Sequence, residues 1–309
     1  MRVLITGVHG FVGSNLVEYL KAENEIYGLD IVSPEKDGVV KTFSWGDLDV
    51  GVVPAMDAII HLAGKAHDTK NKSAAEAYFK VNMGLTQKVI DYFLSSGASK
   101  FVFFSTAKAA ADRVEGVLTE EVVPSPVGPY GESKIAAEKY ILSKELPIGK
   151  QVYIFRPCMI HGPGNKGNLN LLYSVVRKGI PWPLGAFENR RTFTSVENIC
   201  FAVNGVLTSE VESGIYNMGD DEALSTNELI EEICKSLGKR ACIWRLPCGL
   251  MRFVACVGGW LHLPLNPMRL QKLTENYVSS NAKIKAALGV DKMPVSAREG
   301  LRRTLESFR

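Results

Sequence analysis

Short apolar runs alternate with longer amphipathic stretches along the first half of the chain. Six runs are short and rich in β-branched or aromatic residues, which is typical of strands buried on both faces of a sheet: 2–6, 26–29, 41–45, 58–62, 100–104 and 152–155. Apolar residues at helical spacing predict helices over about 11–21, 74–95 and 130–144. This alternation predicts an α/β protein with a Rossmann-type doubly wound parallel sheet and helices on both faces.

The first predicted strand and helix are joined by a turn with the pattern G-x-x-G-x-x-G, formed by Gly7, Gly10 and Gly13. Glycine permits positive φ and lets a pyrophosphate approach the backbone, and the N–H groups of a helix N-terminus hold phosphate charge. The second strand ends at Asp30, whose carboxylate can accept hydrogen bonds from ribose hydroxyls. These features predict a site for NAD, with NADP as the alternative because Lys36 lies nearby. A tight turn without a ligand is the less favoured alternative.

The regular alternation stops after Pro157. A turn-rich loop at 161–168 leads to a predicted helix at 169–178, a strand at 214–218 and mostly helical sequence from 225 onwards. We therefore expect a dinucleotide-binding domain made of residues 1–157 and about 191–219. Residues 158–190 and 220–309 are expected to form a smaller, mostly helical substrate-binding lobe.

Composition narrows the range of partners. The chain has 309 residues, of which 46% are apolar and 22% charged, as in ordinary globular proteins. Its net charge of +3 is small and shows no basic block, so we expect no nucleic-acid partner. The six cysteines are scattered without C-x-x-C pairs, which predicts reduced, mostly buried thiols in a cytoplasmic protein. Neither they nor the histidines show metal-ligand spacing, so we expect no metal.

The longest uncharged run spans residues 253–268. It is too short to cross a bilayer, so we expect no membrane span. A buried helix or a subunit contact is the favoured interpretation, with shallow membrane attachment as the alternative.

Two Y-x-x-x-K patterns occur, at Tyr130–Lys134 and Tyr140–Lys144. Residues four apart share one face of a helix. A lysine ammonium beside a tyrosine phenol lowers the pKa of the phenol, and an oxidised nicotinamide bound nearby is expected to lower it further. Tyr130 directly follows a proline- and glycine-rich loop, and Thr106 at an earlier strand end supplies a second hydroxyl. We therefore predict Thr106, Tyr130 and Lys134 as catalytic and Tyr140 as a packing residue.

Together these motifs resemble the extended short-chain dehydrogenases/reductases, specifically the NAD-dependent nucleotide-sugar epimerase/dehydratase family. The resemblance implies that Thr106 and Tyr130 polarise a sugar oxygen, that Lys134 also binds the nicotinamide ribose, and that Asp47 lies near the adenine. It also implies a homodimer formed through the helix carrying Tyr130 and the helix before it. The implied cofactor-binding residues are Gly7, Gly10, Phe11, Val12, Gly13, Asp30, Asp47, Leu48, Leu62, Ala63, Gly64, Tyr130, Lys134 and Pro157.

The same resemblance implies a nucleotide-sugar substrate and places Asn168 and Arg191 in its diphosphate region, with Arg190 as a weaker candidate. A guanidinium suits a diphosphate because it is a planar fork of donors. Lys108, two residues after Thr106, is the third substrate-binding candidate, with a solvent-facing lysine as the default. His61 and His67 are expected to be structural rather than catalytic bases.

Three positions that depart from the family pattern help to choose among the reactions that the family catalyses. Ala107 and Lys108 stand where dehydratases of the family carry Asp-Glu, and Met159 stands at the usual epimerase asparagine. The segments around 105–108 and 156–168 are more similar to 4-keto-sugar reductases of surface-polysaccharide synthesis. The favoured reaction is therefore hydride transfer to a 4-keto-hexose. A 4-epimerase of the UDP-glucose type, a dehydrogenase for a small hydrophobic alcohol and a non-catalytic cofactor-binding regulator remain alternatives.

Overall fold

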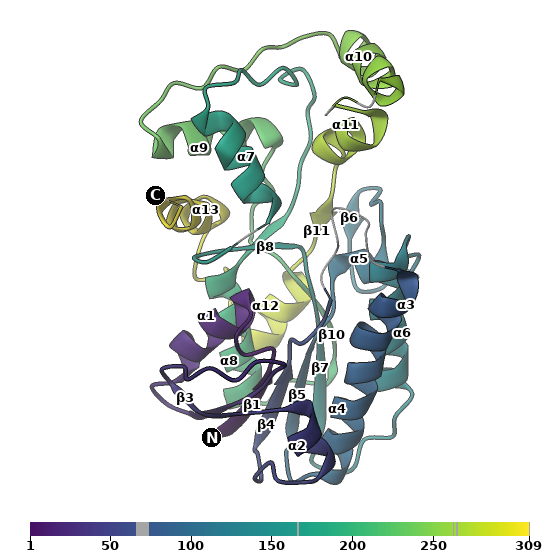
Figure 1. The fold of residues 1–309 in the computed structure, drawn as a ribbon, viewed down its shortest axis with the longest axis vertical. Coiled ribbons are helices and arrows are strands. Elements are labelled where there is room, and N and C mark those ends of the chain that lie inside the picture. The colour runs from purple at the N-terminus through teal and green to yellow at the C-terminus, as the bar shows by residue number, and fades with distance from the viewer. Residues whose placement is uncertain (66–73, 166, 262, 264, 309) are drawn as a thin grey trace.

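The computed structural model describes residues 1–65, 74–165, 167–261, 263 and 265–308. Its centre is a seven-stranded sheet with the order β10-β7-β5-β4-β1-β2-β3 (Figure 1). All neighbouring strands of this sheet run parallel. The strands are β1 (Arg2–Thr6), β2 (Glu25–Leu29), β3 (Val39–Phe43), β4 (Ala58–His61), β5 (Lys100–Phe104), β7 (Gln151–Pro157) and β10 (Gly214–Met218). The chain moves outward in opposite directions from β1 and β4, which creates a switch point where such sheets bind ligands.

Helices cover both faces of this sheet. One face packs against α1 (Phe11–Leu20), α8 (Val196–Thr208) and α12 (Ala282–Leu288), through side chains such as Leu16, Val203 and Ile284. The other packs against α2 (Trp45–Asp49), α4 (Gly84–Ser95) and α6 (Pro129–Leu142). The predicted doubly wound α/β fold is therefore confirmed.

Two local expectations were wrong in detail. The strand expected at 41–45 ends at Phe43, because Ser44 and Asp47 form a reciprocal capping box that begins α2 at Trp45. The single helix expected at 74–95 consists of α3 (Ala75–Tyr78), a π-helical turn η1 (Phe79–Met83) and α4. Such turns occur often at functional sites.

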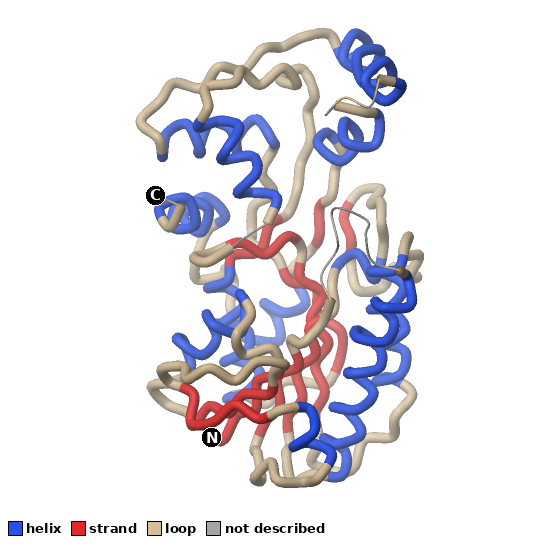
Figure 2. The backbone as a smooth tube through the Cα atoms, in the orientation of Figure 1, coloured by secondary structure: helices blue, strands red, loops and turns tan. Residues whose placement is uncertain are grey.

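The smaller lobe consists mainly of helices and loops (Figure 2) and has its own apolar core. It is built from α7 (Asn168–Arg177), α9 (Thr226–Ser236), α10 (Cys248–Trp260), α11 (Pro267–Thr274) and α13 (Ala297–Glu306). Short strands connect the lobes: β8 (Met159–His161) pairs with β9 (Phe193–Ser195), and β6 (Val117–Leu118) with β11 (Val278–Ser279). The short helix α5 (Ala107–Ala110) follows β5. The predicted division assigned α12 to the substrate lobe, whereas its Ile284 packs into the core of the sheet.

Two further sequence expectations can be compared with this fold. All six cysteines are free, but only Cys200 and Cys234 are buried, so the expectation of mostly buried thiols was wrong. No helix in the described ranges has the length and apolarity needed to cross a bilayer.

Candidate active site

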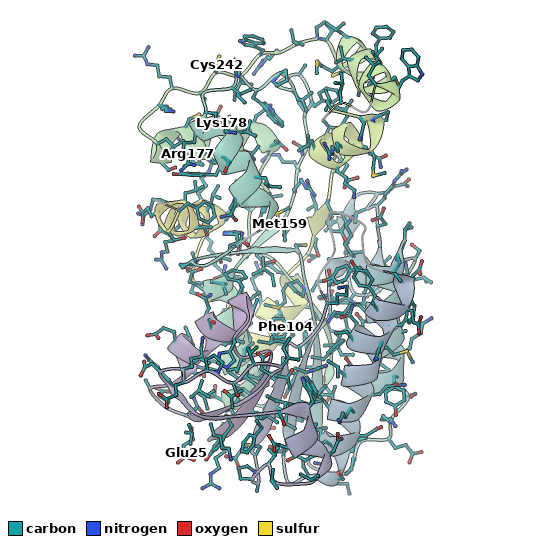
Figure 3. The ribbon with its side chains drawn as sticks, in the orientation of Figure 1. Glu25, Phe104, Met159, Arg177, Lys178 and Cys242 are labelled. Carbon is teal, nitrogen blue, oxygen red and sulfur yellow. The ribbon has the colours of Figure 1, made fainter. Side chains whose placement is uncertain are left out.

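The predicted site residues lie at the carboxyl ends of the central strands, facing the smaller lobe. In Figure 3, Phe104 marks the end of β5 and Met159 lies at the boundary between the sheet and the helical lobe. Gly7 follows β1, Asp30 follows β2, and Thr106 follows β5. Leu62, Ala63 and Gly64 follow β4, and Pro157 closes β7. Parallel strands therefore bring segments distant in sequence to one edge.

The glycine-rich turn is packed too closely for side chains. Gly7 has φ of +71°, and a Cβ there would lie 3.1 Å from the backbone nitrogen of Ala63. A Cβ on Gly13 would lie 2.4 Å from the carbonyl oxygen of Gly7, which no real side chain tolerates. Gly10 caps α1, whose first residues are Phe11 and Val12. The turn thus fits a dinucleotide, since its backbone comes to the surface of the site at a helix N-terminus.

Asp30 is held beside this turn. Its carboxylate accepts hydrogen bonds from the backbone N–H of His9 at 3.1 Å and of Ile31 at 2.7 Å. Lys36 crosses to α1, where its ammonium donates to the Ser14 hydroxyl at 2.8 Å. A carboxylate at the end of β2 matches the ribose hydroxyls of NAD.

NADH is expected to bind more tightly than NADPH. The carboxylate of Asp30 lies where a 2′-phosphate would come, and like charges at short range repel. Titration of the cofactor's fluorescence with each form measures the two affinities. Tighter binding of NADPH would show that Lys36 outweighs Asp30.

Asp47 and Leu48 lie on α2, close to the end of β3. The Asp47 carboxylate accepts from the backbone N–H of Ser44 at 2.7 Å and from its hydroxyl at 2.8 Å, and these bonds lower its pKa. Leu48 is buried in the core beneath. The Asp47 side chain therefore anchors its own turn, and its contact with an adenine stays a prediction.

The structure brings Thr106, Tyr130 and Lys134 together. The Thr106 hydroxyl caps α5 and hydrogen-bonds the Tyr130 phenol. The Lys134 ammonium donates to the carbonyl of Phe104 at 2.7 Å and lies 3.2 Å from where a Cβ on Gly64 would stand. Burial lowers the pKa of Lys134 to about 8, against the opposing charge of Glu138. The lysine is thus fixed between its own helix α6, the end of β5 and the loop after β4.

The expected lowering of the Tyr130 pKa is not what this structure shows. Burial raises the pKa of the phenol, the hydrogen bond with Thr106 acts in the opposite direction, and Tyr78 raises it further. The protein groups alone therefore favour the protonated phenol. That form is the proton donor that a carbonyl reduction requires.

A buried polar network around η1 was missed from the sequence. The Asn82 amide accepts from the Lys65 N–H at 2.7 Å and donates to the Ser133 hydroxyl at 2.9 Å, while Ser133 donates to the Tyr130 carbonyl at 2.9 Å. Asn82 and Ser133 are fully buried. The network ties the loop after β4 to the first turn of α6, which positions Tyr130. Asn82 and Ser133 lie 51 residues apart, so no local pattern joins them.

A second missed network lies deeper, beneath Lys134. Glu138 is fully buried and accepts from the Arg156 guanidinium at 2.5 Å, and the Ser105 hydroxyl also donates to it. Glu138 follows Lys134 by one helical turn, so the two share a face of α6. That spacing, together with an arginine at the end of a buried strand, was the available signal.

The substrate candidates Lys108 and Arg191 both act electrostatically on the Cys158 thiol. Charges on both lower the pKa of that thiol, although burial raises it to about 12 overall. The Lys108 ammonium pairs with the Asp112 carboxylate at 3.0 Å and lies 4.7 Å from the centre of the Tyr277 ring. Lys108 is thus held by Asp112 and Tyr277 rather than left in open solvent, and its role in substrate binding stays a prediction.

The two neighbouring arginines differ in their partners. The Arg191 guanidinium donates to the carbonyl of Lys272 at 2.8 Å, and burial lowers its pKa. Arg190 instead pairs with the Glu228 carboxylate at 3.3 Å on the outer side of the lobe. An anion beside Arg191 would offset the cost of burying its charge, so Arg191 remains the better candidate. The side chain of Asn168 and the whole of His67 lie outside the described residues.

His61 and Tyr140 lie where a structural role was expected. The His61 ring is fully buried between the hydroxyls of Thr6, at 2.7 Å, and Thr86, at 3.0 Å. Burial lowers its pKa to about 3, so it is neutral at physiological pH. The Tyr140 hydroxyl donates to Asp91 at 2.8 Å, which links α6 to α4.

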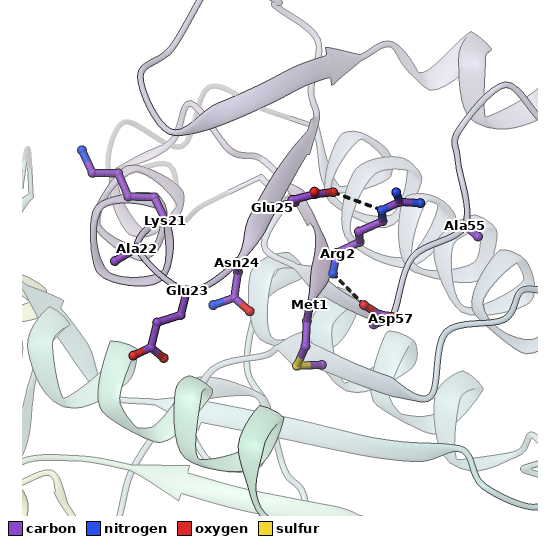
Figure 4. Close-up of a pocket in the computed structure, with 9 residues that line it drawn as sticks. All are labelled: Met1, Arg2, Lys21, Ala22, Glu23, Asn24, Glu25, Ala55 and Asp57. Carbon is purple, nitrogen blue, oxygen red and sulfur yellow. Dashed lines mark hydrogen bonds and ion pairs between the residues drawn. The ribbon is translucent and has the colours of Figure 1, made fainter.

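A depression of about 670 Å³ lies at the opposite, amino ends of the strands (Figure 4). Arg2 and Asp57 line it, joined by a hydrogen bond of 2.7 Å from the Arg2 backbone N–H, and Arg2 also pairs with Glu25 at 3.1 Å. Ligands of open parallel sheets bind at the carboxyl ends. This depression is therefore separate from the candidate active site.

The comparisons with known proteins agree with this geometry. Residues 3–219 match the model of the NAD dependent epimerase/dehydratase family. The chain belongs to this family of NAD-dependent enzymes, which act on nucleotide sugars by epimerisation, dehydration or reduction.

The sequence identity to individual members of the family is low. The chain is 28% identical to UDP-glucose 4-epimerase of Vibrio cholerae, over 99% of this chain and 95% of the relative. It is also 28% identical to GDP-6-deoxy-D-mannose reductase of Pseudomonas aeruginosa, over 74% of this chain and 78% of the relative. Among solved structures, UDP-glucose 4-epimerase of Thermus thermophilus in complex with NAD superposes with a TM-score of 0.76 at 26% identity, over 100% and 99% of the two chains.

Proposed function

We propose that the protein reduces the 4-keto group of a nucleotide-linked hexose during surface-polysaccharide synthesis. When bound, NADH supplies the hydride that reaches the carbonyl carbon. The Tyr130 phenol donates a proton to the carbonyl oxygen, and Thr106 donates a hydrogen bond to the same oxygen. Lys134 holds the nicotinamide ribose, and Arg191 and Lys108 bind the diphosphate.

The identity and placement of Lys108 is the observation that carries this proposal. Family dehydratases need an Asp-Glu pair for water elimination, and Ala107 and Lys108 occupy those positions here. The positive charges of Lys108 and Arg191 both lower the pKa of the Cys158 thiol, so both cations act on the same group. This suits binding of an anionic diphosphate and offers no acid/base pair for dehydration. The relative that acts as GDP-6-deoxy-D-mannose reductase supports the same reaction class.

Epimerisation at C4 is the second candidate, supported by the Vibrio cholerae relative, which aligns over nearly the whole chain. An epimerase returns the hydride to the opposite face of the same sugar, so it consumes no cofactor overall. Met159 stands where the epimerase asparagine is usual and contributes no polar atom that hydrogen-bonds strongly. For this reason we favour reduction. We further propose that the enzyme works in the cytoplasm as a homodimer that pairs through α4 and α6.

Reduction is expected to consume one NADH for each keto-sugar. Purified protein is incubated with NADH and a UDP-4-keto-6-deoxy-hexose, and the NADH absorbance is followed while the sugar product is analysed. A parallel incubation contains UDP-glucose or UDP-N-acetylglucosamine. Tyr140→Phe is the matched control variant, because Tyr140 lies in the second Y-x-x-x-K pattern away from the site.

Interconversion of the hexoses at constant absorbance, with no oxidation of NADH by the keto-sugar, would show that the protein is an epimerase. Binding of NADH without turnover of either class of sugar would instead favour a non-catalytic cofactor-binding regulator.

A further inference from the structure

The end of the helical lobe carries an unusual concentration of exposed apolar side chains. They lie on α10, on α11 and between the two, at the part of the lobe farthest from the sheet (Figure 1). Figure 3 shows side chains of α10 projecting away from the rest of the lobe. Trp260 is 81% exposed, Phe253 67% and Met268 62%. We call this surface the apolar tip, and its members are Leu250, Phe253, Val254, Val257, Trp260, Leu261, Leu263 and Met268.

The buried helix favoured at 253–268 was therefore wrong, whereas the subunit contact favoured beside it is not tested by a single chain. Only a narrow stripe of α10, formed by Met251, Ala255 and Gly258, is buried against the lobe. A Cβ on Gly258 would lie 2.0 Å from the carbonyl oxygen of Leu265, so the segment before α11 packs directly on α10. The two helices form a hairpin whose inner side packs against the lobe and is therefore buried. The apolar tip is the remaining, outward side.

The charge of the surrounding segment is one-sided. Residues 239–274 contain six Lys or Arg and no Asp or Glu, although the whole chain carries a net charge of only +3. Arg245 and Arg252 are exposed within this segment, Arg252 on α10 itself and Arg245 shortly before that helix begins. A segment that combines exposed Trp, Phe and Leu with basic residues, and that contains no Asp or Glu, complements an anionic lipid bilayer.

Other occupants fit this surface less well. At about 1.5 Å per residue, the 13 residues of α10 span roughly 20 Å, too little for the hydrocarbon core of a bilayer. A second copy of the chain, paired about a twofold axis, would bring the same acid-free segment against itself. Like charges would then face one another without counter-charges.

We propose that the apolar tip docks the protein onto the surface of an anionic membrane. The aromatic side chains enter the boundary between headgroups and acyl chains, and the basic residues lie among the anionic headgroups. The tip is joined to the candidate active site, because Arg191 donates to the carbonyl of Lys272 on α11. Docking therefore connects the candidate substrate site to the membrane-bound end of the lobe through α11. This inference does not depend on whether the enzyme reduces or epimerises its sugar.

Co-sedimentation with vesicles tests the docking of the full-length protein. We expect the protein to sediment with vesicles of equal parts phosphatidylcholine and phosphatidylglycerol, and less with phosphatidylcholine alone or at high salt. The double substitution Phe253→Ser with Trp260→Ser should weaken the binding by about tenfold or more, because two large apolar side chains are lost. Turnover of a soluble nucleotide sugar should stay unchanged.

Matched control variants distinguish docking through the apolar tip from non-specific adsorption to the vesicles. Ile148 and Val52 are exposed apolar residues far from the tip in sequence, so Ile148→Ser with Val52→Ser should bind vesicles like the unaltered protein. Arg245→Gln with Arg252→Gln should weaken binding to the anionic vesicles. Lys139→Gln with Lys292→Gln removes the same amount of charge from exposed lysines elsewhere on the protein and should not weaken it.

A second measurement uses the unaltered protein. Lipids with brominated acyl chains should quench part of the fluorescence of its four tryptophans, and Trp260→Phe should reduce the quenched part. Protein that stays in the supernatant with anionic vesicles at low salt would overturn the proposal. Equal losses of vesicle binding in the Phe253→Ser, Trp260→Ser variant and in its Ile148→Ser, Val52→Ser control would also overturn it. The same holds if the protein does not bind vesicles and the tip variant turns a dimer into a monomer.

Discussion

Replacing Tyr130 with Phe is expected to lower turnover by about 10²-fold or more while NADH binding is retained. The substitution removes only the phenol oxygen, which hydrogen-bonds Thr106 and, in the proposed reaction, carries the proton for the sugar oxygen. Because burial raises the pKa of Tyr130, the proton stays on the phenol until the substrate oxygen takes it. Steady-state rates with the keto-sugar and a fluorescence titration with NADH measure the two effects separately.

The chain contains its own matched control. Tyr140 and Lys144 have the same spacing on the same stretch of chain, but the Tyr140 hydroxyl pairs with Asp91 and accepts from Lys144 at 2.7 Å. Tyr140→Phe should therefore leave turnover nearly unchanged and at most loosen the contact between α6 and α4. Near-normal turnover by Tyr130→Phe would contradict the assignment, as would an equal loss in both variants.

The parts of the fold that were predicted correctly have local signals. The signals for the first βαβ unit lie close together in the sequence: a buried strand, three glycines at fixed spacing, a helix and Asp30. The Y-x-x-x-K pattern places Tyr130 and Lys134 on one helix face, whatever the rest of the chain does. Strand ends converge because the sheet is parallel, so the position of Thr106 followed from the fold class.

The parts that were missed depend on distant residues. Asn82 meets Ser133, and Glu138 meets Arg156, only after the helices have packed on the sheet. Burial of the Tyr130 phenol, which raises its pKa in the protein alone, was also missed, and the lowering expected beside an oxidised nicotinamide stays a prediction. The run at 253–268 was misjudged because an apolar sequence does not say which side is covered. On α10, Met251 packs inward and Phe253 points to solvent.

Replacing Glu138 with Leu is expected to cost about 3–5 kcal/mol of unfolding free energy, one of the largest single losses in the molecule. Glu138 is fully buried and holds the buried guanidinium of Arg156 with three hydrogen bonds. Its removal leaves that charge in the interior without a counter-charge, and Ser105 loses its acceptor. Urea unfolding followed by circular dichroism measures the loss, and Glu145→Leu on the exposed loop after α6 is the control.

The double variant Glu138→Leu with Arg156→Met should recover much of this stability, because it removes the buried charge as well as its partner. It should not recover catalysis at higher pH. Glu138 raises the pKa of Lys134, so its loss in either variant lowers that pKa below about 8. The ammonium then loses its proton at a lower pH, and the basic limb of the pH–rate profile shifts the same way. A double variant as unstable as Glu138→Leu would show that Arg156 is not the source of the loss. An unshifted basic limb would show that Glu138 does not act through Lys134.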